Sequence, residues 1–285
     1  MNIHESMLCR WVGYDIENSE HAPQPAPRRK PLKDVRKLSD EQIEKYLSYL
    51  RDALHDRKGL RVSQANDIDR VGAPGPVATP PPCLFFTELA ASAARGHCQF
   101  YGRLGFVLSK KFVFEQGGRP VIYTKSTVKK PDPIIAALKT LRKALRDATP
   151  DSRIALETWA RFLKNTEIVA KENIKGRSYS TKEKAAMNRT QAKKQVASFP
   201  KHNPIPFLGE REWRMLQPNT RNERWFENNQ TLWFRPELGK ELQIIIVPNN
   251  HLLGVAYKSL DICKCLRGKS GVSAQILSLE ALERL

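Results

Sequence analysis

The chain has 285 residues, of which 40% are hydrophobic and 27% are charged, a balance typical of a folded protein rather than a disordered one. Its formal net charge of +18 favours anionic partners, namely nucleic acid, nucleotides, acidic proteins or a membrane surface. No apolar run approaches the roughly 20 residues that span a bilayer, and the N-terminus lacks the basic and apolar regions of a secretory signal. We therefore expect a cytoplasmic protein with no membrane contact.

Residues 1–38 predict an N-terminal arm and a basic, proline-rich linker, and residues 39–285 the main domain. A short apolar piece at 7–14 is compatible with a strand, whereas the proline-rich run at 22–31 cannot pack as a helix or a central strand. The first helix begins at Ser39, which forms a capping box with Gln42. Its apolar residues recur at helical spacing up to Leu54, and Gly59 is a natural stop.

Residues 83–124 predict a strand, a short helix and a hairpin-rich sheet. The apolar run 83–87 is typical of a buried strand, and 88–95 of a short helix. Strands are expected at 105–109 and 111–114, followed by a turn at Gln116–Gly118 and a returning strand at 120–124. His97 falls between the short helix and Tyr101, where a histidine commonly forms a hydrogen bond at a helix end.

A helical and basic insertion is predicted at about 130–203. Residues 131–165 have helical periodicity with a break at Thr149–Asp151. Residues 164–203 are strongly basic with little apolar periodicity, which predicts a long insertion or a solvent-exposed helix. They hold the best candidates for phosphate contacts, which are Lys182, Lys184, Arg189, Lys193 and Lys194.

The remaining strands complete an α+β fold with a mixed or antiparallel sheet and flanking helices. The strongest strand signal is the apolar run Ile244–Val247, which suggests burial on both faces. An edge strand and a short helix are expected at 274–280. The sheet is expected to contain strands near residues 84, 106, 112, 121, 213, 232 and 245. The five cysteines are interpreted as reduced thiols, and no metal site is predicted.

The segment Gly209–Arg214 is short and densely charged. On a strand, Glu210, Glu212 and Arg214 share one face, while Trp213 and Met215 take the other. Carboxylates two residues apart on a strand are separated by about 7 Å. Two carboxylates at this distance with a guanidinium beside them form either a functional site or a salt-bridge patch.

Two blocks together resemble AbiGi, a family of bacterial abortive-infection (phage-resistance) antitoxins. The first comprises Phe86–Leu89, His97, Tyr101–Phe106 and Gly118–Tyr123, and the second comprises Glu210–Arg214 and Leu242–Val247. The resemblance covers residues 83–124 and 205–260, and it implies a role in anti-phage defence rather than a particular reaction. A component of this kind is expected to bind a toxin or another defence protein, or DNA or RNA.

The Glu-x-Glu strand also looks like the carboxylate motif of many mono-ADP-ribosyltransferases. That likeness implies NAD as cofactor, with Glu212 stabilising the cation that develops on the ribose and Glu210 activating the acceptor. The residues expected to line the pocket are Thr87, Glu88, His97, Tyr101, Tyr123 and Arg214. The alternative is a cross-strand ion-pair cluster that fixes the register of the sheet, with Trp213 in the core.

Overall fold

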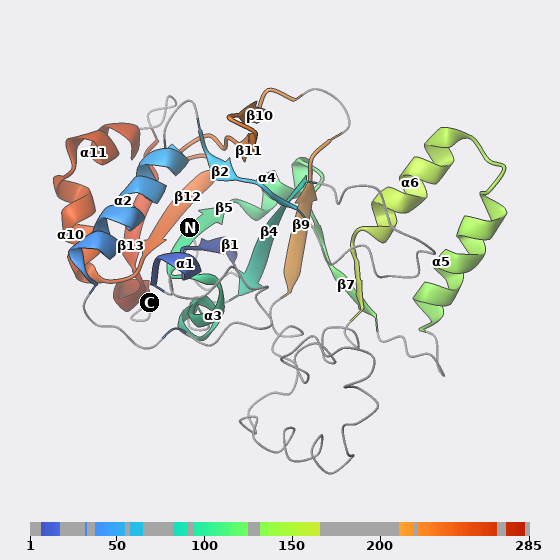
Figure 1. The fold of residues 1–285 in the computed structure, drawn as a ribbon, viewed down its shortest axis with the longest axis horizontal. Coiled ribbons are helices and arrows are strands. Elements are labelled where there is room, and N and C mark those ends of the chain that lie inside the picture. Colours follow the sequence, from blue (N-terminus) through green and yellow to red (C-terminus); the bar gives the residue numbers. More distant parts are fainter. Residues whose placement is uncertain are drawn as a thin grey trace, which may run out of the picture.

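A computed structural model describes residues 7–17, 32, 38–54, 58–64, 82–89, 94–124, 132–165, 211–218, 222–266 and 272–282. Within these ranges the chain forms one large sheet, two smaller sheets and helices that cover the large sheet (Figure 1). The predicted α+β class is therefore confirmed. No helix in the described part combines the length and the apolar character needed to cross a membrane.

The large sheet has eight strands. Seven lie in the order β13-β12-β5-β1-β4-β9-β6, and β3 pairs with β4 beside this path. The strand β12 is parallel to β13, whereas the other pairs are antiparallel, so the sheet is mixed. The bounds are β1 Met7–Val12, β3 Ser63–Gln64, β4 Pro82–Leu89, β5 Leu104–Leu108, β6 Arg119–Pro120, β9 Glu212–Leu216, β12 Leu242–Val247 and β13 Gln275–Ser278.

The two smaller sheets lie outside this path. An antiparallel sheet has the order β10-β11-β2, and a parallel pair is formed by β7 and β8. Their bounds are β2 Leu60–Arg61, β7 Ile122–Thr124, β8 Leu163–Asn165, β10 Trp225–Asn228 and β11 Thr231–Phe234. Because β7 and β8 flank the two helices that follow β7 in the chain, they attach that helical hairpin to the rest of the molecule.

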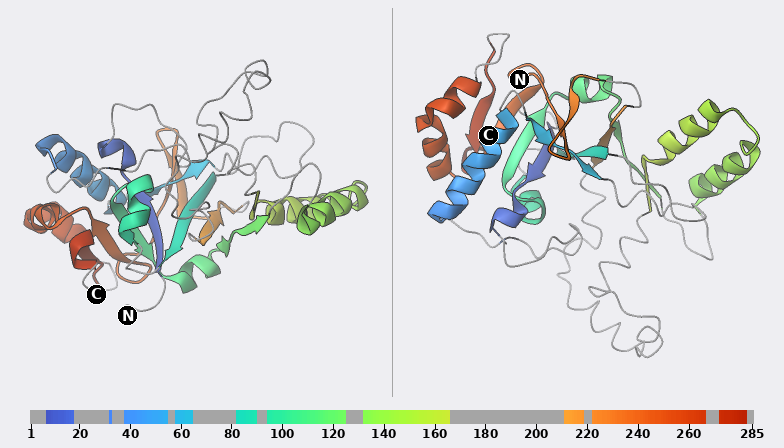
Figure 2. Two further views of the ribbon diagram at one scale, coloured as in Figure 1. Left: turned by 90° about the horizontal axis from the view of Figure 1, so that it is seen from below. Right: turned by 45° about the horizontal axis from the view of Figure 1, so that its top comes forward.

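The helices are α1 Tyr14–Glu17, α2 Asp40–Leu54, α3 Ala94–Tyr101, α4 Lys110–Glu115, α5 Pro133–Ala144, α6 Pro150–Ala160, α10 Asn250–Lys258, α11 Leu260–Leu266 and α12 Leu279–Leu282. The predicted capping box at the start of α2 is confirmed: Ser39 N donates to Gln42 Oε1 at 3.0 Å, and Gln42 N donates to Ser39 Oγ at 3.2 Å. The helices α5 and α6 stand away from the large sheet in every view (Figure 2).

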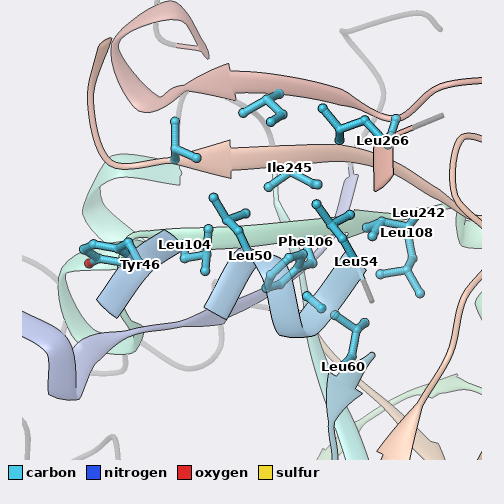
Figure 3. Packing of buried hydrophobic residues seen from close by; sticks show 14 of the residues in the cluster. Tyr46, Leu50, Leu54, Leu60, Leu104, Phe106, Leu108, Leu242, Ile245 and Leu266 are labelled. Atoms are coloured by element: carbon cyan, nitrogen blue, oxygen red, sulfur yellow. The ribbon is translucent and has the colours of Figure 1, made fainter. Parts of the chain in front are cut away.

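Apolar side chains bury both faces of the large sheet. On one face, Tyr46, Leu50 and Leu54 of α2 pack against alternate residues of β5 and β12, including Phe106 and Ile245 (Figure 3). On the other face, side chains of α3 and α12 cover the intervening residues. Those intervening residues are Cys9, Trp11, Val107, Ile244 and Ile246. The expected burial of Ile244–Val247 on both faces is confirmed.

Three local predictions are wrong. Residues 110–115 form α4 instead of the predicted strand near 112, because Ser109 caps a helix by accepting from Phe112 N. Glu88 belongs to β4 rather than to a helix, since the end of this strand pairs with β1, and α3 begins only at Ala94. The helical region predicted to reach residue 165 ends earlier, and β8 follows it.

The strand β1 comes from the segment assigned to the N-terminal arm, yet it lies inside the large sheet between β4 and β5. Its pairing joins Cys9 to Thr87 on one side and Cys9 to Val107 on the other. The strand β13 pairs with β12 alone in the sheet order and is followed directly by α12, which confirms the predicted edge strand and short helix.

Candidate functional site

The two strands that carry the candidate residues are adjacent and antiparallel. Thr87 of β4 lies opposite Glu212 of β9, Phe86 opposite Trp213, and Phe85 opposite Arg214. Because directly paired residues share a face of the sheet, Thr87, Glu212 and Arg214 lie on one face. Trp213 lies on the other, so the predicted alternation along this strand is confirmed. The group of Thr87, His97, Tyr123, Glu212 and Arg214 is called the Glu212 cluster below.

An ion pair lies at the centre of the Glu212 cluster. Arg214 Nε donates to Glu212 Oε1 at 2.7 Å, and Arg214 Nη1 donates to the carbonyl oxygen of Arg161 at 2.7 Å. The side chain of Arg214 is fully buried and that of Glu212 is 11% exposed. A buried guanidinium requires a counter-charge, because its loss of hydration is otherwise uncompensated. Glu212 therefore provides the charge that allows Arg214 to lie inside the sheet.

Backbone groups hold β9 in this position. Glu212 N donates to the hydroxyl oxygen of Tyr123 at 3.4 Å, and Val121 N donates to the carbonyl oxygen of Glu212 at 2.7 Å. Tyr123 lies on β7 and Val121 lies between β6 and β7. The segment from Arg119 to Tyr123 thus contacts the outer edge of β9, and it places a predicted pocket residue beside Glu212.

His97 joins the Glu212 cluster from α3. Its Nε2 lies 3.0 Å from Thr87 Oγ1 in a hydrogen bond, and its ring stacks on Tyr101 with centroids 4.4 Å apart. Burial lowers the pKa of His97 to about 4, so the imidazole is neutral near pH 7. The predicted role as a hydrogen-bonding histidine is confirmed, although His97 lies within the helix rather than after it.

Glu88 is on the opposite face of the sheet from Thr87 and forms a second group. Trp213 Nε1 donates to Glu88 Oε2 at 2.8 Å, and Lys110 Nζ donates to Glu88 Oε1 at 2.6 Å. Arg211 Nη1 lies 3.8 Å from the same carboxylate. The sheet therefore separates Glu88 from the other residues that were expected to line one pocket.

The polar side chains of the Glu212 cluster are largely buried, with Thr87 bound to His97 and Glu212 bound to Arg214. Thr87, His97 and Glu212 are each 9% exposed, and Arg214 is completely enclosed. A dinucleotide needs a concave surface that takes up most of its area. At Glu212 the described side chains present little exposed surface, because the carboxylate is paired with Arg214 and its side chain is 11% exposed.

Cysteine and metal chemistry add no further site in the described part. The cysteines described there are free thiols, and burial, together with nearby Cys98, raises the pKa of the Cys9 thiol. A buried thiol of this kind is a poor nucleophile. No group of three or more histidine, cysteine, aspartate or glutamate side chains in the described ranges could hold a metal ion.

The segments that carry the sequence resemblance are brought together in this region. The blocks containing Thr87, His97, Tyr123 and Glu212 are far apart in the chain yet form one network. Comparisons of the chain with models of protein families, with curated proteins and with solved structures find no match.

Some predicted residues lie outside the described ranges. They are Glu210 and the basic residues Lys182, Lys184, Arg189, Lys193 and Lys194. Conversely, the structure adds two contacts that the sequence analysis missed. Lys110 binds Glu88 and the carbonyl group of Arg161 binds Arg214. A lysine at the start of a helix and a carbonyl at the end of another carry no recognisable motif, so no sequence signal could have identified them.

Proposed function

We propose that this chain is a component of a bacterial anti-phage (abortive-infection) system that acts by binding a protein partner. The supporting observation is that the two blocks resembling AbiGi interlock across β4 and β9. Glu88 of the first block binds Trp213 of the second, and Thr87 lies opposite Glu212. The characteristic residues thus contact one another, as expected of a scaffold that holds a binding surface in place.

Burial favours binding over catalysis. A group that stabilises charge in a transition state must approach the reacting atoms to within about 3 Å. Glu212 instead directs its Oε1 at a fully buried guanidinium, and its side chain is 11% exposed. This arrangement supports the ion-pair interpretation of the Glu-Arg-Glu strand.

The face proposed for the partner is on the α4–α6 side of the molecule. Of the large hydrophobic side chains exposed in the described part, most belong to residues 114–159. They are Phe114 at 52%, Ile122 at 40%, Leu141 at 46%, Ile154 at 49% and Trp159 at 39% exposure. Exposed apolar groups among polar ones are typical of protein-binding surfaces, and tryptophan is a frequent anchor there. The net charge of +18 favours an acidic partner.

The experiment is co-expression with the protein encoded by the adjacent gene. If the pair is an antitoxin and its toxin, the chain restores growth that the neighbour alone stops, and the two proteins co-purify. We expect Ile154→Asp to weaken the complex at least about tenfold, since a charge in an apolar contact loses over 1 kcal/mol. The matched control is Leu260→Asp on α11, which is 74% exposed and far along the chain from the proposed surface. Equal affinity of both variants for the neighbour contradicts the proposed surface.

Nucleic acid is the alternative partner, and the observation that favours it is the charge of +18. Retention of duplex DNA or RNA then weakens steeply from low to physiological salt, because phosphate contacts release counterions. Neutralising Lys182, Lys184, Lys193 and Lys194 together weakens retention further. An absence of binding at low salt removes this alternative and leaves the protein partner.

An ADP-ribosyltransferase-like activity is the alternative for the Glu212 cluster. What favours it is that the Tyr123 hydroxyl lies beside the backbone of a strand glutamate, Glu212, and that Thr87, which binds His97, lies opposite Glu212 in the sheet. Its test is transfer of label from NAD to protein and nucleic acid, with wild type and Glu212→Gln compared at equal amounts of folded protein. Lack of NAD binding by the wild type rules this activity out.

A further inference from the structure

The strand β1 separates from β4 partway along its length. Its pairing with β4 covers Met7 to Cys9, and further along β4 the short strand β3 takes its place, with Ser63 opposite Cys83. Arg10 lies on β1 where the two strands separate. Its neighbours Cys9 and Trp11 belong to the apolar group beneath α3, so Arg10 points to the other face, away from the Glu212 cluster.

Arg10 is buried without a carboxylate. It is 7% exposed, and its Nη2 donates to the carbonyl oxygen of Arg61 at 2.6 Å and to Ser63 Oγ at 3.2 Å. No carboxylate in the described part lies within the 4.0 Å of an ion pair with it. The other buried arginines there differ: Arg103 binds Glu17 at 2.8 Å and Arg214 binds Glu212 at 2.7 Å. Among the described residues, Arg10 is therefore a buried cation with no carboxylate paired to it.

A second arginine, Arg61, lies near the guanidinium of Arg10. The pKa of Arg10 is lowered to about 10, first by burial and also by the nearby charge of Arg61, while Cys83 and Tyr49 act in the opposite direction. Two carboxylates act on the neighbouring Tyr49: Asp15 shares a hydrogen bond with its hydroxyl, and Asp52, paired with Lys58 at 2.7 Å, lies close by. Neither carboxylate neutralises the Arg10 guanidinium.

Part of the guanidinium is still available to a ligand. Both of its hydrogen bonds in the described part use Nη2, which leaves Nη1 and Nε. The polar atoms there that are fully enclosed and without a partner are Trp11 Nε1, Trp233 Nε1 and Asn249 Nδ2. The two remaining nitrogens of Arg10 are not among these enclosed atoms. Arg61 and Ser63 are both exposed.

We propose that Arg10, Arg61 and Ser63 form a binding site for a phosphate-class oxyanion. Two guanidinium groups offer the forked, charge-assisted donors that phosphate oxygens accept, and the serine hydroxyl adds a third donor. A dianion would supply a counter-charge that no described carboxylate gives to Arg10. Arg10 lies on the face opposite Glu212, whereas Ser63 is paired with Cys83, on the same face of β4 as Thr87. Phosphate binding by these residues does not depend on the role of the Glu212 cluster.

The test is the melting temperature of the full chain in inorganic phosphate and in chloride at equal ionic strength. A ligand that binds the folded state raises the melting temperature with its concentration. We expect phosphate to raise it above the chloride value, and Arg61→Gln to weaken phosphate binding about tenfold, as the loss of one charge-assisted hydrogen bond implies. Arg146→Gln is the matched control, because Arg146 is an exposed arginine that follows α5. It leaves phosphate binding unchanged.

A second variant and a second ligand sharpen the result. Arg10→Gln should abolish the rise in melting temperature that phosphate causes. If this variant does not fold, Arg61→Gln and Ser63→Ala still test the site, because each should weaken phosphate binding. An oligonucleotide with a 5′-phosphate that competes with inorganic phosphate, when the 5′-hydroxyl form does not, identifies a nucleic-acid end as the source of the anion. Competition by neither oligonucleotide assigns the site to a small phosphate ligand. A wild-type melting temperature that is equal in phosphate and chloride, or an Arg61→Gln variant that binds phosphate as wild type does, overturns the proposal.

Discussion

Replacing Glu212 with glutamine should destabilise the fold strongly. Glutamine has nearly the same shape and removes the charge, which leaves the Arg214 guanidinium fully buried without its counter-charge. Removal of one partner from a buried ion pair costs about 3–5 kcal/mol of unfolding free energy. Since glutamine Oε1 can still accept from Arg214 Nε, we expect a loss at the lower end, about 3 kcal/mol. In a chain of this size this lowers the melting temperature by roughly 6–12 °C.

The assay is urea unfolding followed by tryptophan fluorescence, since Trp213 is adjacent to the substituted residue. The matched control is Glu157→Gln. Glu157 also forms an ion pair, with hydrogen bonds of 2.7 and 2.6 Å from Arg142, but its side chain is 48% exposed. Exposed pairs contribute less than about 1 kcal/mol. Equal stability of Glu212→Gln and wild type, with activity lost, would refute the scaffold interpretation and restore the catalytic one.

Three further predictions concern the residues around this network. Gly102→Ala should destabilise the fold by more than about 2 kcal/mol, because residue 102 has a φ of +108° and a Cβ would lie 2.1 Å from a backbone oxygen of β1. The control is Gly96→Ala on α3, where a Cβ meets nothing within 4 Å. In the same urea titration this control should stabilise the fold by up to about 1 kcal/mol. Because the pKa of His97 falls from 6.5 to about 4 on folding, the stability that its neutral form gives is fully present above pH 6.5. Up to about 3 kcal/mol of unfolding free energy is lost as the pH falls to 4. Urea titrations across this range should give a smaller pH dependence of stability for His97→Gln than for wild type, and an equal pH dependence contradicts the assignment. Ser39→Ala should cost about 1 kcal/mol by removing the cap of α2, whereas Ser48→Ala within the same helix should cost nothing measurable by thermal unfolding.

The sequence predicted features whose causes are local. The capping box at Ser39 involves residues three apart, and the apolar run from Ile244 to Val247 reflects burial on both faces of one strand. The alternation of Glu212 and Arg214 against Trp213 follows from strand geometry alone. Each of these depends on a few neighbouring residues, and the structure confirms each one.

The errors arose where a distant segment decides the local conformation or where a local helix cap was not recognised. An alanine-rich stretch favoured a helix from Glu88 onward, but pairing with β1 keeps Glu88 in β4. The apolar run Phe112–Phe114 suggested a strand, whereas the cap at Ser109 begins a helix. The placement of Glu88 and Thr87 on opposite faces follows from this extension of β4, so the predicted pocket could not be assembled correctly from the sequence.

The most direct test of the account measures the affinity between this chain and the product of its adjacent gene. Wild type, Glu212→Gln and Ile154→Asp should be compared by titration at equal amounts of folded protein. We predict that the wild type binds, that folded Glu212→Gln binds with the same Kd, and that Ile154→Asp binds at least about tenfold more weakly. A complex that is lost in folded Glu212→Gln and retained in Ile154→Asp would contradict the account, because the Glu212 cluster would then be the functional site rather than its scaffold.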